Sequence, residues 1–270
     1  MVKIVSASRR TDIPAFYGDW FMSKLKEGGL IVRHPFNGKE TYISLKVEDV
    51  ACFVFWSKNY APFISKLEEL ERLGYPFVMH FTITGLPRYL EEVVPPAEAS
   101  VEVFRHLSRL FSTGRIMWRY DPVFLGKETD FSFHKENFAG LCRMLEGYTE
   151  RCYISFVHPY RKVEKRLKKK GIEIMEAGEA SCRGLASSLA DIAWKHGIEM
   201  YACCSSYLVG DKVKKARCVD AELMENLFGI GSGLFRRRPS RPACGCSESV
   251  DLGSYGTCRH GCIYCYARGG

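Results

Sequence analysis

The sequence lacks the two kinds of segment that carry a protein into or across a membrane. Among its 270 residues there is no run of about 18 or more apolar residues, which a membrane-spanning helix requires. The first residues lead straight into a strand-like segment at 3–6, without the basic, apolar and small-residue regions of a secretion signal. We therefore expect a cytoplasmic protein that has no membrane partner.

Internal repeats, low-complexity tracts and a G-x-G-x-x-G turn after an early strand-like segment are also absent. The missing glycine turn argues against a dinucleotide-binding sheet. Apolar residues make up 46% of the chain and charged residues 26%, which is ordinary for a globular protein with a sizeable interior. A chain of this length and composition is expected to fold around one core.

Short apolar segments rich in Val, Ile, Phe and Tyr alternate with amphipathic segments. The apolar segments predict buried parallel strands at residues 3–6, 30–33, 51–56, 77–82, 115–120, 153–157 and 198–202. The amphipathic segments predict helices at residues 62–73, 97–111, 132–145, 181–196 and 220–227. This alternation predicts an α/β fold in residues 1–235, a complete or partial (β/α) barrel of parallel strands. A cysteine-rich segment, residues 236–270, is expected to pack on the barrel.

The C-terminal ends of the predicted strands carry a recurring set of polar and charged residues. They occur at residues 6–12, 33–37, 56–59, 80–85, 119–122 and 158. Singly, each has a structural explanation: Asp12 and Asp121 could cap a helix or turn before a nearby proline, and Arg9 could pair with Asp12. Because strand ends meet at one edge in such folds, their recurrence predicts a polar pocket there.

The formal charge of +8 is concentrated in two basic runs, residues 161–170 and 236–241. Such runs attract phosphates or other anionic partners. More often, however, such runs are a solvated helix face or a connecting loop that faces water, and we favour that interpretation.

Twelve cysteines are many for a cytosolic protein. That compartment keeps thiols reduced, so metal binding or redox chemistry is favoured over a disulfide framework. Four cysteines stand singly in apolar patterns and are expected in the core: Cys52, Cys142, Cys152 and Cys182. The other eight are concentrated between Cys203 and Cys265.

The last three cysteines, Cys258, Cys262 and Cys265, form a C-x3-C-x2-C motif. Soft thiolates at these spacings on a tight loop can converge on three corners of a cubane iron–sulfur cluster and leave one iron open to a reactant. The alternative is a zinc site with a fourth ligand from His260, Cys244 or Cys246. Zinc prefers four tetrahedral ligands, often in two separated pairs, which this motif fits less well.

With Tyr264 before Cys265, the motif resembles the hallmark of radical S-adenosylmethionine (radical SAM) enzymes. The resemblance implies a [4Fe-4S] cluster whose open iron binds SAM, reductive cleavage of SAM to a 5'-deoxyadenosyl radical, and an electron donor such as a flavodoxin or ferredoxin. In most of these enzymes the motif follows the first barrel strand. Here a strand-like segment at 249–255 precedes it, and we expect this segment to pair beside the N-terminal strand in a circularly permuted arrangement.

Across nearly its whole length, the sequence also resembles the uncharacterised family called domain of unknown function 1848. The resemblance rests on residues 6–15 (SASRRTDIPA), 54–59 (VFWSKN), 118–122 (WRYDP) and 260–267 (HGCIYCYA). It implies no substrate.

Cys204, Cys218, Cys244 and Cys246 could furnish four thiolates for a second iron–sulfur cluster. Cys203 and Cys204 follow the strand predicted at 198–202, at the edge where the pocket is expected. Because adjacent residues of a strand face opposite ways, only one of the two is expected to be a ligand, and Cys204 is preferred. The alternative is that all of these are ordinary free thiols.

The sequence thus predicts a radical SAM enzyme acting on an unknown substrate, for which an anion is one candidate. Arg9, Arg10 and Asp12 are expected near SAM or the substrate, because arginine forks bind carboxylates and phosphates. The alternative function is a non-catalytic iron–sulfur or zinc-bound module that binds nucleic acid. The chain contains no recognisable nucleic-acid-binding motif, which counts against that alternative.

Overall fold

The computed structural model describes residues 2–158, 160–239, 241 and 243–268. Eight parallel strands form one sheet in the order β10-β1-β4-β5-β6-β7-β8-β9. Their bounds are β1 Lys3–Ser6, β4 Val50–Ser57, β5 Phe77–Thr82, β6 Ile116–Val123, β7 Arg151–Phe156, β8 Glu199–Ala202, β9 Val213–Lys215 and β10 Val250–Asp251. The predicted α/β fold with a large parallel sheet is therefore confirmed.

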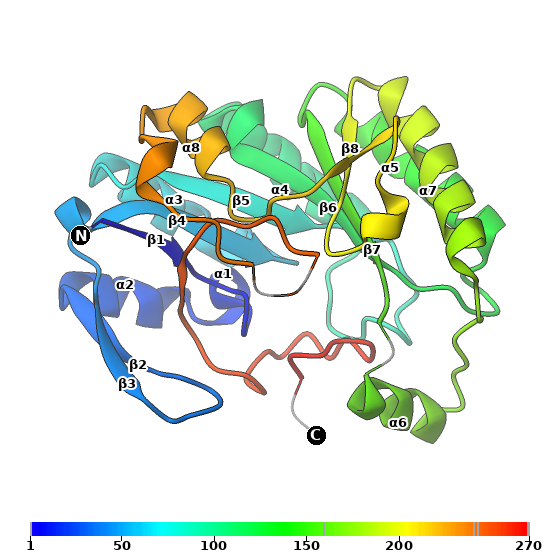
Figure 1. Cartoon of the computed structure of the whole chain (residues 1–270), viewed down its shortest axis with the longest axis horizontal. Coiled ribbons are helices and arrows are strands. Elements are labelled where there is room, and N and C mark those ends of the chain that lie inside the picture. Colours follow the sequence, from blue (N-terminus) through cyan, green and yellow to red (C-terminus); the bar gives the residue numbers. More distant parts are fainter. Residues whose placement is uncertain (1, 159, 240, 242, 269–270) are drawn as a thin grey trace.

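The sheet is open. In the part of the chain that the structure describes, the strand order is linear and β10 and β9 form its two edges (Figure 1). Of the complete or partial barrel that we expected, these strands therefore do not form the complete one. At one edge β10 pairs in parallel with β1, with Val250 opposite Val5 and Asp251 opposite Ser6. The strand before the C-terminal cysteine motif thus lies beside the N-terminal strand, as predicted. Residues 236–270 therefore contribute a strand to the same sheet as residues 1–235.

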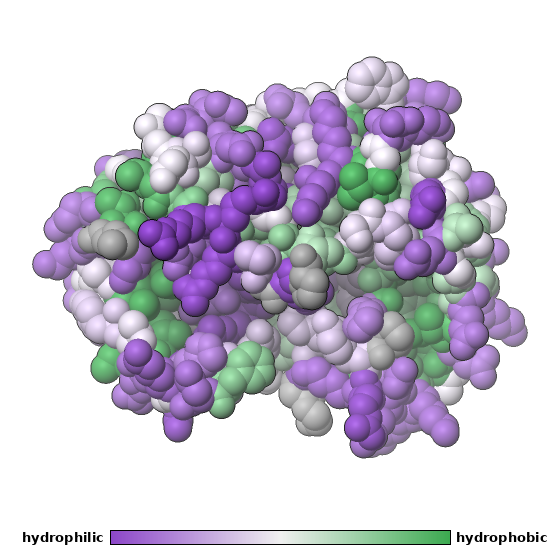
Figure 2. All heavy atoms as spheres, viewed as in Figure 1, coloured by the Kyte–Doolittle hydropathy of each residue, from purple (hydrophilic) through white to green (hydrophobic). Residues whose placement is uncertain are grey.

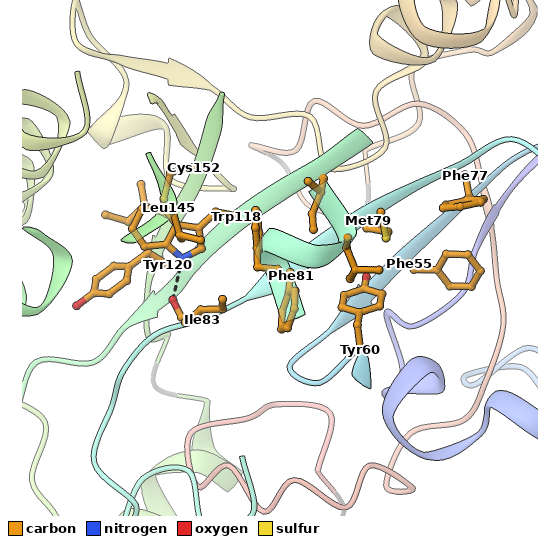
Figure 3. Packing of buried hydrophobic residues seen from close by; sticks show 14 of the residues in the cluster. Phe55, Tyr60, Phe77, Met79, Phe81, Ile83, Trp118, Tyr120, Leu145 and Cys152 are labelled. Atoms are coloured by element: carbon orange, nitrogen blue, oxygen red, sulfur yellow. Dashed lines mark hydrogen bonds between the residues drawn. The ribbon is translucent and has the colours of Figure 1, made fainter. Parts of the chain in front are cut away.

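The main hydrophobic core lies between one face of the sheet and most of the helices. The α-helices that the structure describes, in this core and outside it, are α1 Ile13–Phe16, α2 Gly18–Lys26, α3 Ile64–Arg72, α4 Ala97–Phe111, α5 Phe131–Leu145, α6 Arg161–Lys169, α7 Glu179–Trp194 and α8 Ala221–Phe228. Figure 3 shows alternate residues of the central strands, such as Phe77, Met79 and Phe81 of β5, within this core. The indole of Trp118 donates a hydrogen bond to the carbonyl of Ile83 at 2.9 Å.

The opposite face of the sheet is covered by α8 and by the segments around it. Ile4, Val54 and Met117 pack there against Met224 of α8. Because both faces are covered, the strands read as continuous apolar runs, which is typical of parallel sheets. The four single cysteines, Cys52, Cys142, Cys152 and Cys182, are buried in the two cores, as expected.

One predicted strand is not part of this sheet. Residues of β2, Gly29–Arg33, pair with β3, Glu40–Ser44, in an antiparallel hairpin that stands apart from the main sheet. The turn contains Asn37, whose Oδ1 accepts from the amide of Lys39, and Gly38, which adopts a positive φ of 67°. The prediction of a buried parallel strand at 30–33 was wrong: Leu30 and Val32 are half-buried on one side of the strand, whereas Ile31 and Arg33 on the other side are exposed, as a two-stranded ribbon allows.

Most basic residues at 161–170 are exposed on or just after α6, and only Val163 and Leu167 of this helix are buried. Arg166 is half-buried and donates to the carbonyl of Cys265. Figure 2 shows strongly hydrophilic side chains over α6. The interpretation as a solvated helix face fits this segment. In the second basic run, 236–241, residue 240 lies outside the described residues. Among the helices described, none has the length and apolar character needed to cross a lipid bilayer.

Candidate functional site

A cavity of about 650 Å³ opens at the C-terminal ends of the sheet strands. Six neighbouring strands contribute wall residues at or just after their ends. They are Ser8 and Arg9 for β1, Trp56 and Lys58 for β4, Thr82 for β5, Arg119 and Asp121 for β6, Phe156 and His158 for β7, and Cys203 and Cys204 for β8. The rest of the wall comes from Cys218 and from side chains within residues 241–246 and 262–266. A pocket therefore lies at the edge where we predicted a polar one, and its wall combines charged side chains with aromatic side chains and thiols.

Two sets of predicted edge residues do not reach the cavity. Residues 33–37 lie at the tip of the β2–β3 hairpin, because their strand belongs to the separate ribbon. His80 lies within β5 and is buried between Trp56 and Tyr153 on the face of the sheet. Residues 33–37 and His80 therefore follow the same sequence pattern as the residues of this edge, but they lie elsewhere in the structure.

Of the three residues expected to bind SAM or substrate, only Arg9 lines the cavity. Its guanidinium lies 3.4 Å from Asp251 of β10 and 5.5 Å from the centroid of the Trp56 ring. Arg10 is buried, and its guanidinium lies 3.9 Å from the same Asp251. Arg9 can therefore meet a ligand, whereas Arg10 lies behind the cavity wall.

Asp12 joins the N-terminal and C-terminal parts of the chain. Its Oδ1 accepts from Ser57 Oγ at 2.7 Å and from the amide of Ala15 at 2.9 Å, which caps α1. Its Oδ2 accepts from the amide of Lys58 at 2.9 Å and lies 2.8 Å from His260 Nε2. With all these partners and no place in the cavity wall, Asp12 holds the C-terminal motif onto α1 and β4 rather than contacting a ligand.

The terminal motif, Cys258, Cys262 and Cys265, lies beside the cavity at the C-terminal ends of the strands. Cys262 and Cys265 line the cavity, and Cys258 is half-buried beside them. Burial raises the pKa of Cys258 to about 11 and that of Cys262 to about 12, and neighbouring cysteines of the motif contribute to both shifts. The Lys58 ammonium opposes the shift at Cys262 but does not cancel it, so burial favours the protonated form of both thiols.

Glu91, in the loop after β5, anchors the same motif. The hydroxyl of Tyr264 donates to its carboxylate, as do Thr84 Oγ1 at 2.8 Å and Lys58 Nζ at 2.7 Å. Burial alone would lower the pKa of Lys58, but the attraction of Glu91 and Cys262 raises it above its ordinary value. Glu91 was not among the predicted site residues, because it stands in a loop segment with no motif to mark it.

Arg119 and His80 position Cys218 from β6 and β5. Arg119 Nη1 donates to Cys218 Sγ at 3.2 Å, and its Nε donates to Asp121 at 3.1 Å. His80 Nε2 lies 2.8 Å from the carbonyl oxygen of Cys218, which can only accept, so the ring carries its proton on Nε2. Burial, reinforced by the charge of Arg119, lowers the pKa of His80 to about 4.

Five cysteines from three segments of the chain gather at the same cavity: Cys203, Cys204, Cys218, Cys244 and Cys246. Cys203 Sγ lies 3.2 Å from Cys218 Sγ and 4.0 Å from Cys204 Sγ. Cys218 also hydrogen-bonds Cys246, and Cys204 hydrogen-bonds Cys244. We call this set the five-cysteine group.

The expectation that Cys203 and Cys204 face opposite ways is wrong. Strand β8 ends at Ala202, and Cys204 has a positive φ of 53°, so the alternation of a strand does not extend to it. Both side chains turn towards the cavity. The four cysteines that the sequence analysis grouped, Cys204, Cys218, Cys244 and Cys246, do lie together, with Cys203 as an additional member.

No group of three or more His, Cys, Asp or Glu side chains in the described ranges surrounds a position suited to a single metal ion. A cubane makes a different demand, because its ligand sulfurs lie on the order of 6–7 Å apart around four irons rather than around one ion.

Residues 4–267 match the family described as "Domain of unknown function (DUF1848)". No curated protein matches the chain. Two crystal forms of a "putative phosphomethylpyrimidine kinase" from Bacteroides thetaiotaomicron are similar at 12% and 11% identity, with TM-scores of 0.25 and 0.26. Each match covers 71% of this chain, which spans 60% or 59% of the kinase chain. Likeness at this level carries no argument about fold or function.

Proposed function

The chain belongs to the DUF1848 family, which matches residues 4–267, and we propose that it is a radical SAM enzyme. In this proposal Cys258, Cys262 and Cys265 hold a [4Fe-4S] cluster, and the cavity at the strand ends receives SAM and the substrate. The cytoplasm is the expected location, and the electron donor is expected to be a flavodoxin or ferredoxin.

The observation that carries the proposal is the position of β10. This strand immediately precedes the cysteine motif and pairs with β1 at the edge of the parallel sheet. In spatial order, the motif therefore follows the first strand of the sheet, although it lies at the C-terminal end of the sequence. This is the arrangement that the resemblance to radical SAM enzymes calls for, and two of the three cysteines open onto the cavity.

The donor set of the motif fits such a cluster. Three thiols are the soft ligands that iron–sulfur centres prefer, and their partial burial keeps water from competing for the metal. A bound cation would favour the thiolate forms that burial disfavours. Once bound, the cluster would supply the electron that cleaves SAM.

The residues of the cavity support an anionic ligand beside the motif. Arg9 and Lys58 both line the cavity, Arg9 beside Asp251 and Lys58 in an ion pair with Glu91. The Lys58 ammonium also lies 5.9 Å from the centroid of the Tyr264 ring, and Tyr264 stands between Cys262 and Cys265 in the sequence. The Arg9 guanidinium could also bind a carboxylate or phosphate, because Asp251 contacts it through Nη1, at 3.4 Å, and a guanidinium carries several donors.

The experiment that tests the proposal is an assay of SAM cleavage. Protein purified without oxygen is reduced in the presence of SAM, and 5'-deoxyadenosine is measured. We expect the parent protein to form it and the Cys258→Ala/Cys262→Ala/Cys265→Ala variant to form none. Cys142→Ala is the matched control, because Cys142 is buried in α5 outside the cavity wall and its removal should leave cleavage intact. Protein that binds stoichiometric zinc and no iron after anaerobic reconstitution would contradict the proposal.

A further inference from the structure

We infer that the five-cysteine group is a second iron–sulfur site, closed by four thiolates. It consists of Cys218, Cys244, Cys246 and one of the adjacent pair Cys203 and Cys204. The inference rests on the arrangement of these residues and does not require that the terminal motif bind SAM.

The five thiols are brought together by the fold rather than by spacing in the sequence. Cys203 and Cys204 follow β8, Cys218 precedes α8, and Cys244 and Cys246 lie in the segment that leads to β10. The amide of Ser247 donates to the carbonyl of Val219 at 2.9 Å, which fixes the last segment beside the second. Figure 1 shows the orange segment before β10 running beside the yellow segment after β8.

Hydrogen-bond donors are directed at the sulfur atoms of this group. Arg119 Nη1 donates to Cys218 Sγ at 3.2 Å, the amide of Val219 donates to Cys246 Sγ at 3.4 Å, and the amide of Cys246 donates to Cys244 Sγ at 3.4 Å. A neutral thiol gains little from such donors, whereas a thiolate is stabilised by them. Charged and amide donors around sulfur are typical of iron–sulfur centres, where they tune the reduction potential.

The number of thiol ligands determines whether a cluster has an iron open to a reactant or has every iron bound by the protein. We assign one ligand to the adjacent pair Cys203 and Cys204, because a four-thiolate site needs one thiol beyond Cys218, Cys244 and Cys246. With Cys218, Cys244 and Cys246 this makes four thiolates, which is the complete ligand set of a [4Fe-4S] cluster and leaves no iron for SAM. The nearest sulfurs, 3.2 Å and 4.0 Å apart, would separate as the cluster enters between them.

Iron and acid-labile sulfide in three proteins test the inference. All are prepared without oxygen and reconstituted alike: the parent, the Cys258→Ala/Cys262→Ala/Cys265→Ala variant, and the Cys244→Ala/Cys246→Ala variant. We expect each variant to hold about half the iron and sulfide of the parent, because each loses one of two cubanes. The Cys142→Ala/Cys182→Ala variant is the matched control, since these cysteines lie in α5 and α7, and it should hold as much iron as the parent.

The outcomes separate this inference from the proposed function. If the Cys258→Ala/Cys262→Ala/Cys265→Ala variant holds no iron while the parent holds one cluster and cleaves SAM, the five-cysteine group is not a cluster site and the proposed function stands. If only the Cys244→Ala/Cys246→Ala variant loses its iron, the inference stands and the proposed function fails. A Cys203–Cys218 disulfide in the anaerobic parent, detected by mass spectrometry after alkylation, would also overturn the inference.

Discussion

The two groups of cysteines at the cavity are built in different ways. The terminal motif takes its three thiols from eight consecutive residues, Cys258 to Cys265, and its neighbours hold the backbone and the side chains between the cysteines. The five-cysteine group takes its thiols from three distant segments. Three donors, one of them the Arg119 guanidinium, point at its sulfur atoms, whereas in the terminal motif the amide of Ala267 donates to Cys265 Sγ at 3.3 Å. The first group is thus a preformed loop fixed onto the sheet, whereas the second exists only when the sheet and its connections have folded.

This difference predicts how each group responds to mutation. Damage to the contacts of Asp12 or Glu91 should loosen the terminal motif and leave the five-cysteine group in place. Substitutions of His80 or Arg119 should instead loosen the five-cysteine group and leave the terminal motif in place. Four changes, from the largest expected effect to the smallest, test this separation.

Asp12→Ala should have the largest effect on stability. It leaves the buried donors of Ser57, Lys58 and Ala15 without their acceptor and removes the contact to His260. Because unsatisfied buried donors cost about 1–3 kcal/mol each, we expect the free energy of unfolding to fall by about 3 kcal/mol or more in urea titrations. Asp19→Ala is the control, since Asp19 is exposed and its loss should change stability by less than about 0.5 kcal/mol. An equal effect of the two substitutions would show that Asp12 does not anchor the motif.

The contrast between the groups also explains what could be predicted from the sequence. Strands, helices and the C-x3-C-x2-C motif each depend on residues that are close together in the sequence. The strand predicted at 77–82 and the helix predicted at 97–111 therefore have the same bounds as β5 and α4. The hairpin of β2 was missed as such because its partner strand is polar and exposed. Glu91 was missed because its role depends on contacts with residues far away in the chain. Cys203 was ranked behind Cys204 because the left-handed conformation of Cys204, which turns both side chains to the cavity, leaves no mark in the sequence.

Histidine protonation should destabilise the region of the five-cysteine group. His80 is fully buried with its pKa lowered to about 4, so it stays neutral in the folded protein while the unfolded chain takes up a proton below pH 6.5. The stability that His80 contributes is therefore complete above pH 6.5 and is lost as the pH falls towards 4, by about 3 kcal/mol. We expect urea unfolding of metal-free protein between these pH values to show this loss, and His80→Gln to show a shallower dependence. Identical pH profiles would contradict the assignment of a neutral His80.

Glu91→Gln should weaken the terminal motif specifically. The substitution removes the charge that pairs with the buried Lys58 ammonium but keeps a side chain of the same shape. We expect a loss of about 2 kcal/mol in the free energy of unfolding, because a hydrogen bond to a charged group is lost. Glu92→Gln is the matched control, since Glu92 is the exposed neighbour. Iron lost from the five-cysteine group instead of the terminal motif would contradict the separation of the two sites.

Arg9→Ala and Arg10→Ala should differ in kind, with the smallest effects of the series. Arg9 lines the cavity, so its loss should weaken SAM binding about tenfold, or about 1.4 kcal/mol, with little change in stability. Arg10 is buried behind the wall, so its loss should lower stability and leave SAM binding unchanged. Isothermal titration calorimetry and urea unfolding measure the two effects. If neither substitution changes SAM binding, the residues after β1 only support the fold.

The most direct test of the difference between the groups is low-temperature electron paramagnetic resonance of the reduced protein with and without SAM. The Cys244→Ala/Cys246→Ala variant retains the terminal motif, and its cluster signal should change when SAM is added, because three thiolates leave one iron open. The Cys258→Ala/Cys262→Ala/Cys265→Ala variant retains the five-cysteine group, and its signal should be insensitive to SAM. A signal in the first variant that SAM does not alter would contradict the account of Cys258, Cys262 and Cys265 as the SAM-binding site.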